Sequence, residues 1–243
     1  MALTDNLVAY WRLEESSGTR VDSSGNGRDM TGSGSPGGRT GKLNNAVDLV
    51  PGSSQFLSSS DAAVYGAITD SAGWTIAGWL YSDDNATREI FGCWNAFKGL
   101  EVYYISGSRD MTAQWWSNAS GLVVSTAGAS FTSGAWNFFA LKYDPGTDKL
   151  YARSNGTTNS GSSCAGNTFT QNASAFYLGK ARSSTGSYFD GGLDDIGIWS
   201  RALSGAELDQ LYNSGAGLDP TASTQAKGLP IIARHHYAVY GGG

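Results

Sequence analysis

The chain has 243 residues, which is long enough to bury a substantial core, and all-β sandwiches of this length are often single domains. Its 34 glycines and its low charged content of 15% are typical of many short strands joined by tight turns. A formal charge of −5 disfavours nucleic acid and anionic membranes as partners. The two cysteines, Cys93 and Cys164, exclude a disulfide framework and leave two free thiols or a single bridge as alternatives.

The first residues, MALTDNLVAYW, contain neither a basic region nor an apolar stretch as long as a signal peptide or a membrane span. We therefore expect no signal peptide in this chain and no membrane insertion. Export, if it occurs, would use another route.

From Leu7 onward, apolar residues recur with a period of two, and turn residues separate the runs. A polar turn over Val21–Asp29 and a Gly/Ser stretch over Gly32–Gly41 interrupt the first part of the chain. The predicted strands are Leu7–Leu13, Ala46–Leu49, Gln55–Leu57, Trp74–Tyr81, Glu89–Trp94, Leu100–Ile105, Met111–Ser117, Gly121–Ser125, Trp136–Tyr143, Lys149–Ser154, Phe176–Lys180 and Leu193–Trp199. So many strands with almost no helix predict an all-β fold of two packed antiparallel sheets.

The segment WTIAGWLY, Trp74–Tyr81, is apolar on both faces and is therefore predicted to be a central strand. The period-two faces of the strongest strands also predict core residues. These are Trp74, Ile76, Leu80, Phe139, Leu141, Leu178, Leu193 and Ile198.

One helix is predicted, over Gly205–Tyr212. Ser204 is a good N-cap, Glu207 completes a capping box three residues later, and Gly215 lies where a helix stop is expected. We expect Leu208 and Leu211 to hold this helix on the sandwich.

Four segments resemble laminin-G-like domains of the concanavalin-A-like lectin/glucanase group. They are NLVAYWRLEESSGTRVDSSGNGRD, WTIAGWLYSD, GAWNFFALKYDPGTDKLYARSNG and FDGGLDDIGIWSRALSGAELDQLYNSG. The last is the most specific, because a strand, a turn and a capped helix follow in fixed order. One departure is Trp136-Asn137, where the family often has Trp-His. The resemblance implies a two-sheet antiparallel jelly-roll sandwich with one short C-terminal helix.

This domain is expected to occupy residues 1–218, followed by a polar linker over 219–228 and an apolar segment over 229–243. The last segment is too apolar and β-prone to remain in water. It would either fold back on its own sandwich or join a neighbouring subunit by strand addition, which would make a homo-oligomer or a larger assembly. The predicted partner-binding residues are Leu229, Ile231, Ile232, Tyr237, Val239 and Tyr240.

Catalysis is not expected. The only histidines, His235 and His236, lie beyond the domain, which disfavours a Ser/His/Asp site or a zinc site in the sandwich. Glycosidases of the related fold carry their acids in a Glu-x-Asp-x-Glu run on one strand, and no such run exists here. The five glutamates are scattered along the chain, so no acid pair is expected.

Oxygen-rich side chains suggest a structural calcium site. Asp22, Asn26 and Gly27 lie in one turn, and the family resemblance implies that this turn lies near the strand carrying Asp194 and Asp195. Calcium takes six to eight oxygen ligands, which a turn and a strand can supply. The alternative is that Asp22 only caps its own turn through backbone N–H groups.

Exposed aromatic rings could stack on the C–H face of a sugar. In Trp115-Trp116, neighbours on a strand point to opposite faces, so one of them must point away from the core. Trp94 and Tyr103 are further ligand-binding candidates, and burial between the sheets is the alternative for each ring.

Together these observations predict a non-catalytic binding or adhesion module, displayed outside a cell or on a virion. Its partners would be surface glycans or a host-surface protein. A structural decoration or assembly protein that binds no glycan is the alternative, and a glycoside hydrolase is the third class.

Overall fold

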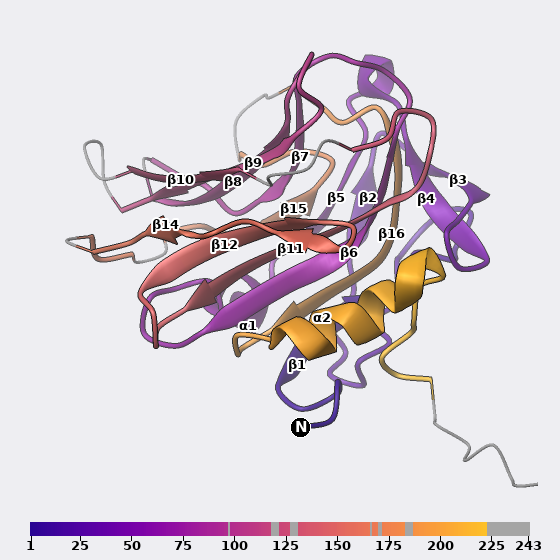
Figure 1. Ribbon diagram of the computed structural model, residues 1–243. Coiled ribbons are helices and arrows are strands. Elements are labelled where there is room, and N and C mark those ends of the chain that lie inside the picture. The colour runs from indigo at the N-terminus through magenta and orange to yellow at the C-terminus, as the bar shows by residue number, and fades with distance from the viewer. Residues whose placement is uncertain are drawn as a thin grey trace, which may run out of the picture.

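The computed structural model describes residues 1–96, 98–117, 122–126, 131–165, 167–169, 172–182 and 187–222. Within them, two antiparallel sheets stack face to face, and a helix lies against the outside of one sheet (Figure 1). The predicted all-β sandwich with one short C-terminal helix is therefore confirmed.

The first sheet has nine strands in the described residues. Its order is β13-β12-β11-β6-β16-β4-β3, with β1 pairing β16 and β14 pairing β12. The bounds are β1 (Leu7–Trp11), β3 (Gly37–Thr40), β4 (Asn45–Leu49), β6 (Trp74–Ser82), β11 (Asn137–Asp144), β12 (Lys149–Ser154), β13 (Thr157–Thr158), β14 (Ser162–Ser163) and β16 (Gly191–Trp199).

The second sheet has seven described strands in the order β10-β9-β8-β7-β15-β5-β2. The bounds are β2 (Thr31–Ser33), β5 (Phe56–Ser59), β7 (Arg88–Gly92), β8 (Gly99–Tyr104), β9 (Met111–Trp116), β10 (Leu122–Thr126) and β15 (Phe176–Leu178).

Helix α2 (Gly205–Tyr212) begins and ends as predicted. The Ser204 side chain accepts a hydrogen bond from the Glu207 N–H, and the Glu207 carboxylate accepts one from the Ser204 N–H. The short helix α1 (Ala62–Gly66) and the 3₁₀ turns η1 (Pro51–Ser53) and η2 (Asn213–Gly215) were not predicted. Each spans a turn or so, which is too short to show a helical period.

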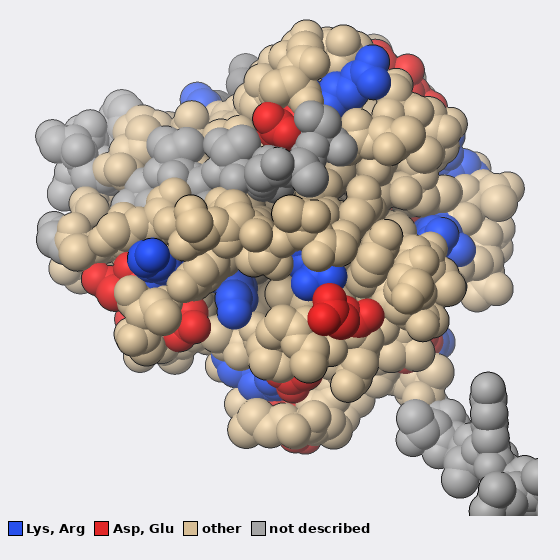
Figure 2. Space-filling model, viewed as in Figure 1, with Lys and Arg blue, Asp and Glu red and all other residues tan. Residues whose placement is uncertain are grey.

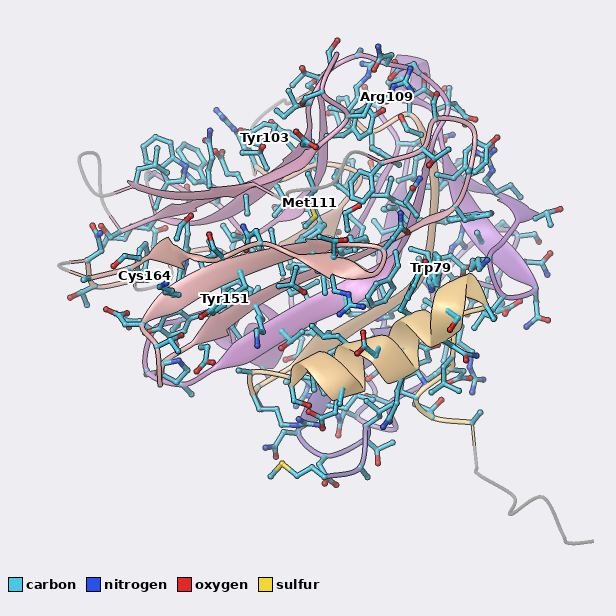
Figure 3. All side chains as sticks on the ribbon, viewed as in Figure 1. Trp79, Tyr103, Arg109, Met111, Tyr151 and Cys164 are labelled. Atoms are coloured by element: carbon cyan, nitrogen blue, oxygen red, sulfur yellow. The ribbon has the colours of Figure 1, made fainter. Side chains whose placement is uncertain are left out.

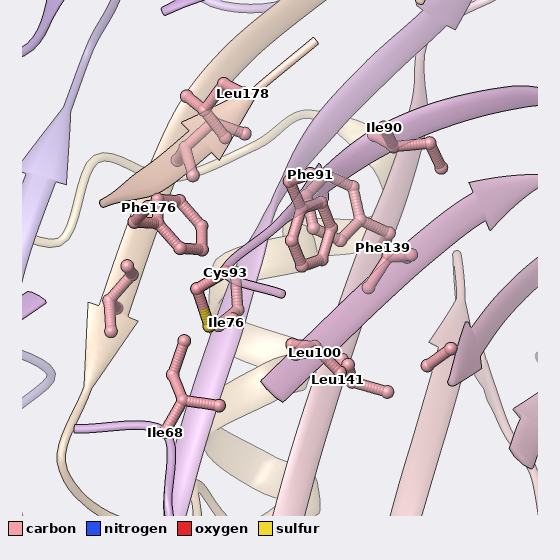
Figure 4. Packing of buried hydrophobic residues seen from close by; sticks show 14 of the residues in the cluster. Ile68, Ile76, Ile90, Phe91, Cys93, Leu100, Phe139, Leu141, Phe176 and Leu178 are labelled. Carbon is pink, nitrogen blue, oxygen red and sulfur yellow. The ribbon is translucent and has the colours of Figure 1, made fainter. Parts of the chain in front are cut away.

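Strand β6 is central, as its sequence predicts. It pairs with β11 on one side and with β16 on the other, and its two faces serve different cores. Trp74, Ile76 and Leu80 lie between the two sheets, whereas Ala77 and Trp79 pack beneath α2. All eight predicted core residues are fully buried. Figure 4 shows part of the inter-sheet core, with Ile76, Phe139 and Leu141 facing Phe91 and Phe176.

The structure differs from the strand prediction at several strand ends and in the unpredicted strands β2, β3, β13 and β14. Strand β1 ends at Trp11 and not at Leu13, whose φ of 61° is left-handed. The Gly/Ser stretch contains the strands β2 and β3, which are largely exposed and therefore show no apolar alternation. Strand β15 ends at Leu178, because Gly179 turns the chain at a φ of 87°.

The distribution of charged side chains and the state of the two cysteines can be compared with what the composition predicts. Basic and acidic side chains are interspersed over the face seen in Figure 2 and form no extended patch of one sign. Cys93 and Cys164 are both buried and are not joined by a disulfide, so the alternative of a single bridge is not borne out. No helix in the described part of the chain is long and apolar enough to cross a membrane.

Candidate functional site

The outer face of the seven-stranded sheet carries a half-exposed aromatic cluster. Along β8 and β9, alternate side chains point into the core, and those between them point outward. Tyr103 on β8 and Trp116 on β9 are outward residues, and both are half-buried. Figure 3 shows Tyr103 on the side of this sheet away from Met111, which lies in the core.

A buried carboxylate holds the polar edges of these two rings. Glu101, fully buried on β8, accepts hydrogen bonds from Tyr103 Oη at 3.0 Å and from Trp116 Nε1 at 3.1 Å. Burial raises the pKa of Glu101 and the nearby Arg182 guanidinium opposes that shift. Hydrogen bonds to their polar edges fix the orientation of both rings.

Arg182 joins this cluster to Trp94. Its Nε lies 2.5 Å from Glu101, its Nη2 donates to Tyr103 Oη at 2.7 Å, and its guanidinium lies 5.0 Å from the centre of the Trp94 ring. The structure therefore gathers three of the four predicted ligand-binding residues, Trp94, Tyr103 and Trp116, around one ion pair. We call Trp94, Glu101, Tyr103, Trp116 and Arg182 the Arg182 cluster.

The fourth predicted residue, Trp115, belongs to the core. It is fully buried, with its ring 3.8 Å from that of Phe169 and edge-on to Trp74 at 5.3 Å. The prediction that one of the Trp115-Trp116 pair points outward is confirmed for Trp116. The assignment of Trp115 to ligand binding was wrong, because the alternation of β9 turns its ring between the sheets.

The structure also forms an acid pair that the sequence analysis did not expect. Glu89 on β7 and Glu101 on β8 both reach Arg182 Nε, at 3.4 and 2.5 Å. Glu89 is itself buried and accepts a hydrogen bond from the Ala181 N–H at 2.8 Å. Their outward positions on two neighbouring predicted strands were a signal for this proximity, but the bridging arginine is distant in sequence.

Asp22 holds its own turn together and ties it to strand β1. Its carboxylate accepts hydrogen bonds from the N–H groups of Tyr10, Ser24 and Arg28 and from the Ser24 hydroxyl. These bonds hold the pKa of Asp22 below its ordinary value, although burial opposes them. In the same turn, Asn26 donates to the carbonyls of Leu7 and Val8.

Asp194 and Asp195 lie at an irregularity of β16, where the register against β6 shifts. Asp194 accepts hydrogen bonds from the N–H groups of Lys42 and Leu43, and Asp195 accepts one from the Tyr10 hydroxyl. Burial, reinforced for Asp194 by the charge of Asp195, raises the pKa of Asp194 to about 8, and burial raises that of Asp195 to about 7. Asp195 also borders a surface hollow with Arg12, Glu14, Leu43, Asn44 and Asp219.

The predicted calcium ligands do not form one ligand set. Within the described residues, which include Asp22, Asn26, Gly27, Asp194 and Asp195, no three acidic, histidine or cysteine side chains come close enough to share a metal ion. The turn does lie near β16, because Asp22 bridges Trp11 of β1 and Trp11 pairs with Ile196 of β16. The Asp22 carboxylate, however, is bonded to the N–H groups of its own turn and of Tyr10. Calcium binding by other ligands stays a prediction.

The predicted partner-binding residues, Leu229, Ile231, Ile232, Tyr237, Val239 and Tyr240, lie outside the described residues. Assembly through this segment, and the domain boundary that precedes it, therefore stay predictions.

The comparisons with known proteins agree with this architecture. A family model described as the concanavalin A-like lectin/glucanases superfamily matches residues 51–209, more than half of the chain. The chain belongs to this superfamily. The resemblance seen in the sequence is thereby confirmed. A comparison with curated proteins finds no match.

Several solved structures share the superfamily fold. Domain 4 of AbnA, an extracellular arabinanase from Geobacillus stearothermophilus in complex with arabinotriose, has a TM-score of 0.65 and 15% identity and covers 88% of this chain and 98% of its own. The binding domain of Paraclostridial Mosquitocidal Protein 1 has a TM-score of 0.71 and 15% identity, over 88% of this chain and 53% of that one. The binding domain of Botulinum Neurotoxin DC in complex with SialylT has a TM-score of 0.67 and 11% identity, over 88% and 52%. The chain thus spans about half the length of these toxin domains, and the likeness establishes a common fold.

Proposed function

We propose that this chain is a non-catalytic module that binds glycans on the outer face of the seven-stranded sheet, at the Arg182 cluster. The observation that carries the proposal is the convergence of Trp94, Tyr103 and Trp116 around Glu101 and Arg182. Strand alternation requires no aromatic residues at outward positions, where any polar side chain would serve.

The chemistry of the cluster suits a sugar. Aromatic ring faces stack on the C–H face of a pyranose or furanose, and half-buried rings lose little conformational freedom when they do so. The Tyr103 hydroxyl and the Arg182 guanidinium offer polar groups beside the rings, as a ring with many hydroxyls requires. A few aromatic and arginine side chains usually supply most of the binding free energy of an interface.

The acid pair supports binding over hydrolysis. A glycosidase needs one carboxyl group free to protonate the leaving oxygen and a second free to attack or to activate water. Here Glu101 is fully buried beneath the rings, and both Glu89 and Glu101 reach the nitrogen of one arginine. Neither carboxylate is therefore presented to a substrate.

The structural neighbours lend the proposal further support. One of them is a domain of an extracellular arabinanase in complex with arabinotriose, and another is a toxin binding domain in complex with SialylT. A toxin domain in complex with rat synaptotagmin II keeps a host protein as the alternative partner. The proposal includes a location outside the cell or on a virion, and the domain of the extracellular arabinanase supports the extracellular location.

A glycan array probed with the purified chain, with and without a chelator, tests the proposal. We expect binding that Trp116→Ala weakens at least tenfold. Trp136→Ala is the matched control, because Trp136 is also half-buried but packs against Tyr81 on the nine-stranded sheet. An array without any bound glycan, or equal losses in both variants, would refute the proposal. Release of reducing sugar from a bound glycan would refute its non-catalytic part.

A further inference from the structure

Beside the Arg182 cluster lies a second aromatic group that contains a buried lysine. The Lys180 ammonium lies 3.9 Å from the centre of the Phe56 ring and 4.5 Å from that of Tyr177. The Phe56 ring also stacks on Tyr188 at 6.2 Å. Lys180 is only 6% exposed, whereas the three rings are half-buried. We call these four residues the Lys180 cluster.

The two clusters lie on one face of the sheet. In the register of the seven-stranded sheet, Tyr177 lies opposite Gly92, and Gly92 lies opposite Glu101. Residues opposite each other in adjacent strands point to the same face, so Tyr177 and Glu101 are separated by two strand spacings, or about 10 Å. An oligosaccharide held on one cluster would therefore reach the other.

One short segment supplies the cation of each cluster. Residues 180–182 follow the turn at Gly179. Ala181 packs directly against Gly92, because a Cβ added to Gly92 would lie 2.9 Å from the Ala181 Cβ. From this segment Lys180 enters one aromatic group and Arg182 enters the other.

The two cations differ in their partners. Arg182 is neutralised by Glu89 and Glu101. Within the described residues, the Lys180 ammonium has neither a hydrogen bond nor an ion pair, and its contacts are the two ring faces. Burial lowers the pKa of Lys180, and the more distant charge of Glu89 only partly opposes this. An ammonium has three donors, and the residues that the structure describes offer them no acceptor.

We propose that the Lys180 cluster is a second subsite, in which Lys180 binds the carboxylate of an acidic sugar residue such as a uronic acid. The rings of Phe56 and Tyr177 would contact the sugar beside that carboxylate. A single carboxylate matches the one ammonium of this cluster, whereas a densely charged ligand would also be repelled by the nearby Glu89 and Glu101. This inference rests on the glycan-binding proposal, and it names the class of glycan that the face selects.

The experiment compares acidic oligosaccharides with neutral counterparts of the same length. Oligogalacturonate, oligoglucuronate and alginate oligomers, and the same oligomers after carboxyl reduction, are titrated into the wild-type chain by calorimetry. We expect at least one acidic oligomer to bind about tenfold more tightly than its reduced form. Lys180→Met should abolish this preference, and Lys180→Arg should retain most of it.

Lys142→Met is the matched control, because Lys142 also lies over a tyrosine ring, that of Tyr151, at 5.1 Å, but on the nine-stranded sheet. It should keep the acid preference. Neutral glycan binding that depends on Trp116 without any acid preference would overturn the second subsite and leave the glycan-binding proposal standing. Preference for a sulfated oligomer, lost in Lys180→Met, would overturn the carboxylate assignment. An acid preference that survives in Lys180→Met would overturn the role of Lys180.

Discussion

The two outer faces of the sandwich carry similar side chains in different surroundings. On the nine-stranded sheet, Trp79 and Phe138 point outward, but α2 lies over them, and Trp79 is only 3% exposed (Figures 1 and 3). On the seven-stranded sheet, the outward Tyr103 and Trp116 are half-buried and have no such helix in the described structure. Strand alternation places aromatic residues on the outer faces of both sheets. Helix α2 covers one of these faces and turns its aromatic residues into part of a second core.

The two faces are also held together differently. Beneath α2, apolar burial dominates, with Leu208 and Leu211 inserted against the sheet. On the open face, the Glu101 carboxylate and its three donor side chains order the rings. Polar networks of this kind are suited to a binding surface, because they bond the polar edges of the rings and so fix their orientation.

The largest expected effect concerns the covered face. Leu208→Ala should lower the free energy of unfolding by about 3 kcal/mol, because it removes a buried leucine and leaves a cavity beneath α2. Urea denaturation measures the loss. Gln210→Ala on the exposed side of the helix is the control and should change stability by less than about 0.5 kcal/mol. Glycan affinity should not change, and a loss of affinity in Leu208→Ala would break the separation of the two faces.

On the open face, Glu101→Ala should cost about 2 kcal/mol of stability, because it leaves buried donors of Tyr103, Trp116 and Arg182 without their acceptor. It should also weaken glycan binding, since the rings lose their fixed orientation. Gln114→Ala is the control, because Gln114 lies opposite Glu101 on the same face. Unchanged affinity in Glu101→Ala would show that the network does not position the rings.

The adjacent aspartates Asp194 and Asp195 on β16 should make the free energy of unfolding depend on pH. The pKa values of Asp194 and Asp195 are raised to about 8 and about 7, so the folded state holds protons that the unfolded chain releases near pH 4. The stability that this proton binding supplies is complete below about pH 4. It is lost as the pH rises through about 7 and about 8.

Asp195→Asn removes one of the two charges and can still accept the Tyr10 hydrogen bond. This variant should therefore be more stable than the wild type by about 1–2 kcal/mol at pH 8 and similar to it at pH 4. Thermal unfolding at both pH values measures the difference. An equal difference at both values would contradict the raised pKa.

The smallest expected effect concerns the turn at Asp22. Asp22→Ala should cost about 1 kcal/mol, because it removes the acceptor of three backbone N–H groups at the edge of β1. The loss in melting temperature should be the same in calcium and in chelator. A loss seen only in calcium would restore Asp22 as a calcium ligand.

Much of the fold could be predicted from local patterns. The two apolar faces of Trp74–Tyr81 indicated a central strand, and the Ser204 and Glu207 pair fixed the start of α2. The alternation of neighbours showed that one of Trp115 and Trp116 points outward, but it did not show which one. Period two states that neighbours face opposite sides, and only the opposing sheet decides which side is the core.

By itself, the sequence determined the all-β class, most strands, the capped helix and the inter-sheet core, since these depend on residues close together in the chain. Only the tertiary structure decided that Arg182 meets Glu89 and Glu101, that Lys180 lies between Phe56 and Tyr177, and that the Asp22 carboxylate bonds Tyr10 and its own turn. These contacts join residues from separate strands and loops. Their geometry depends on strand order and on the turn at Gly179, which no local period encodes.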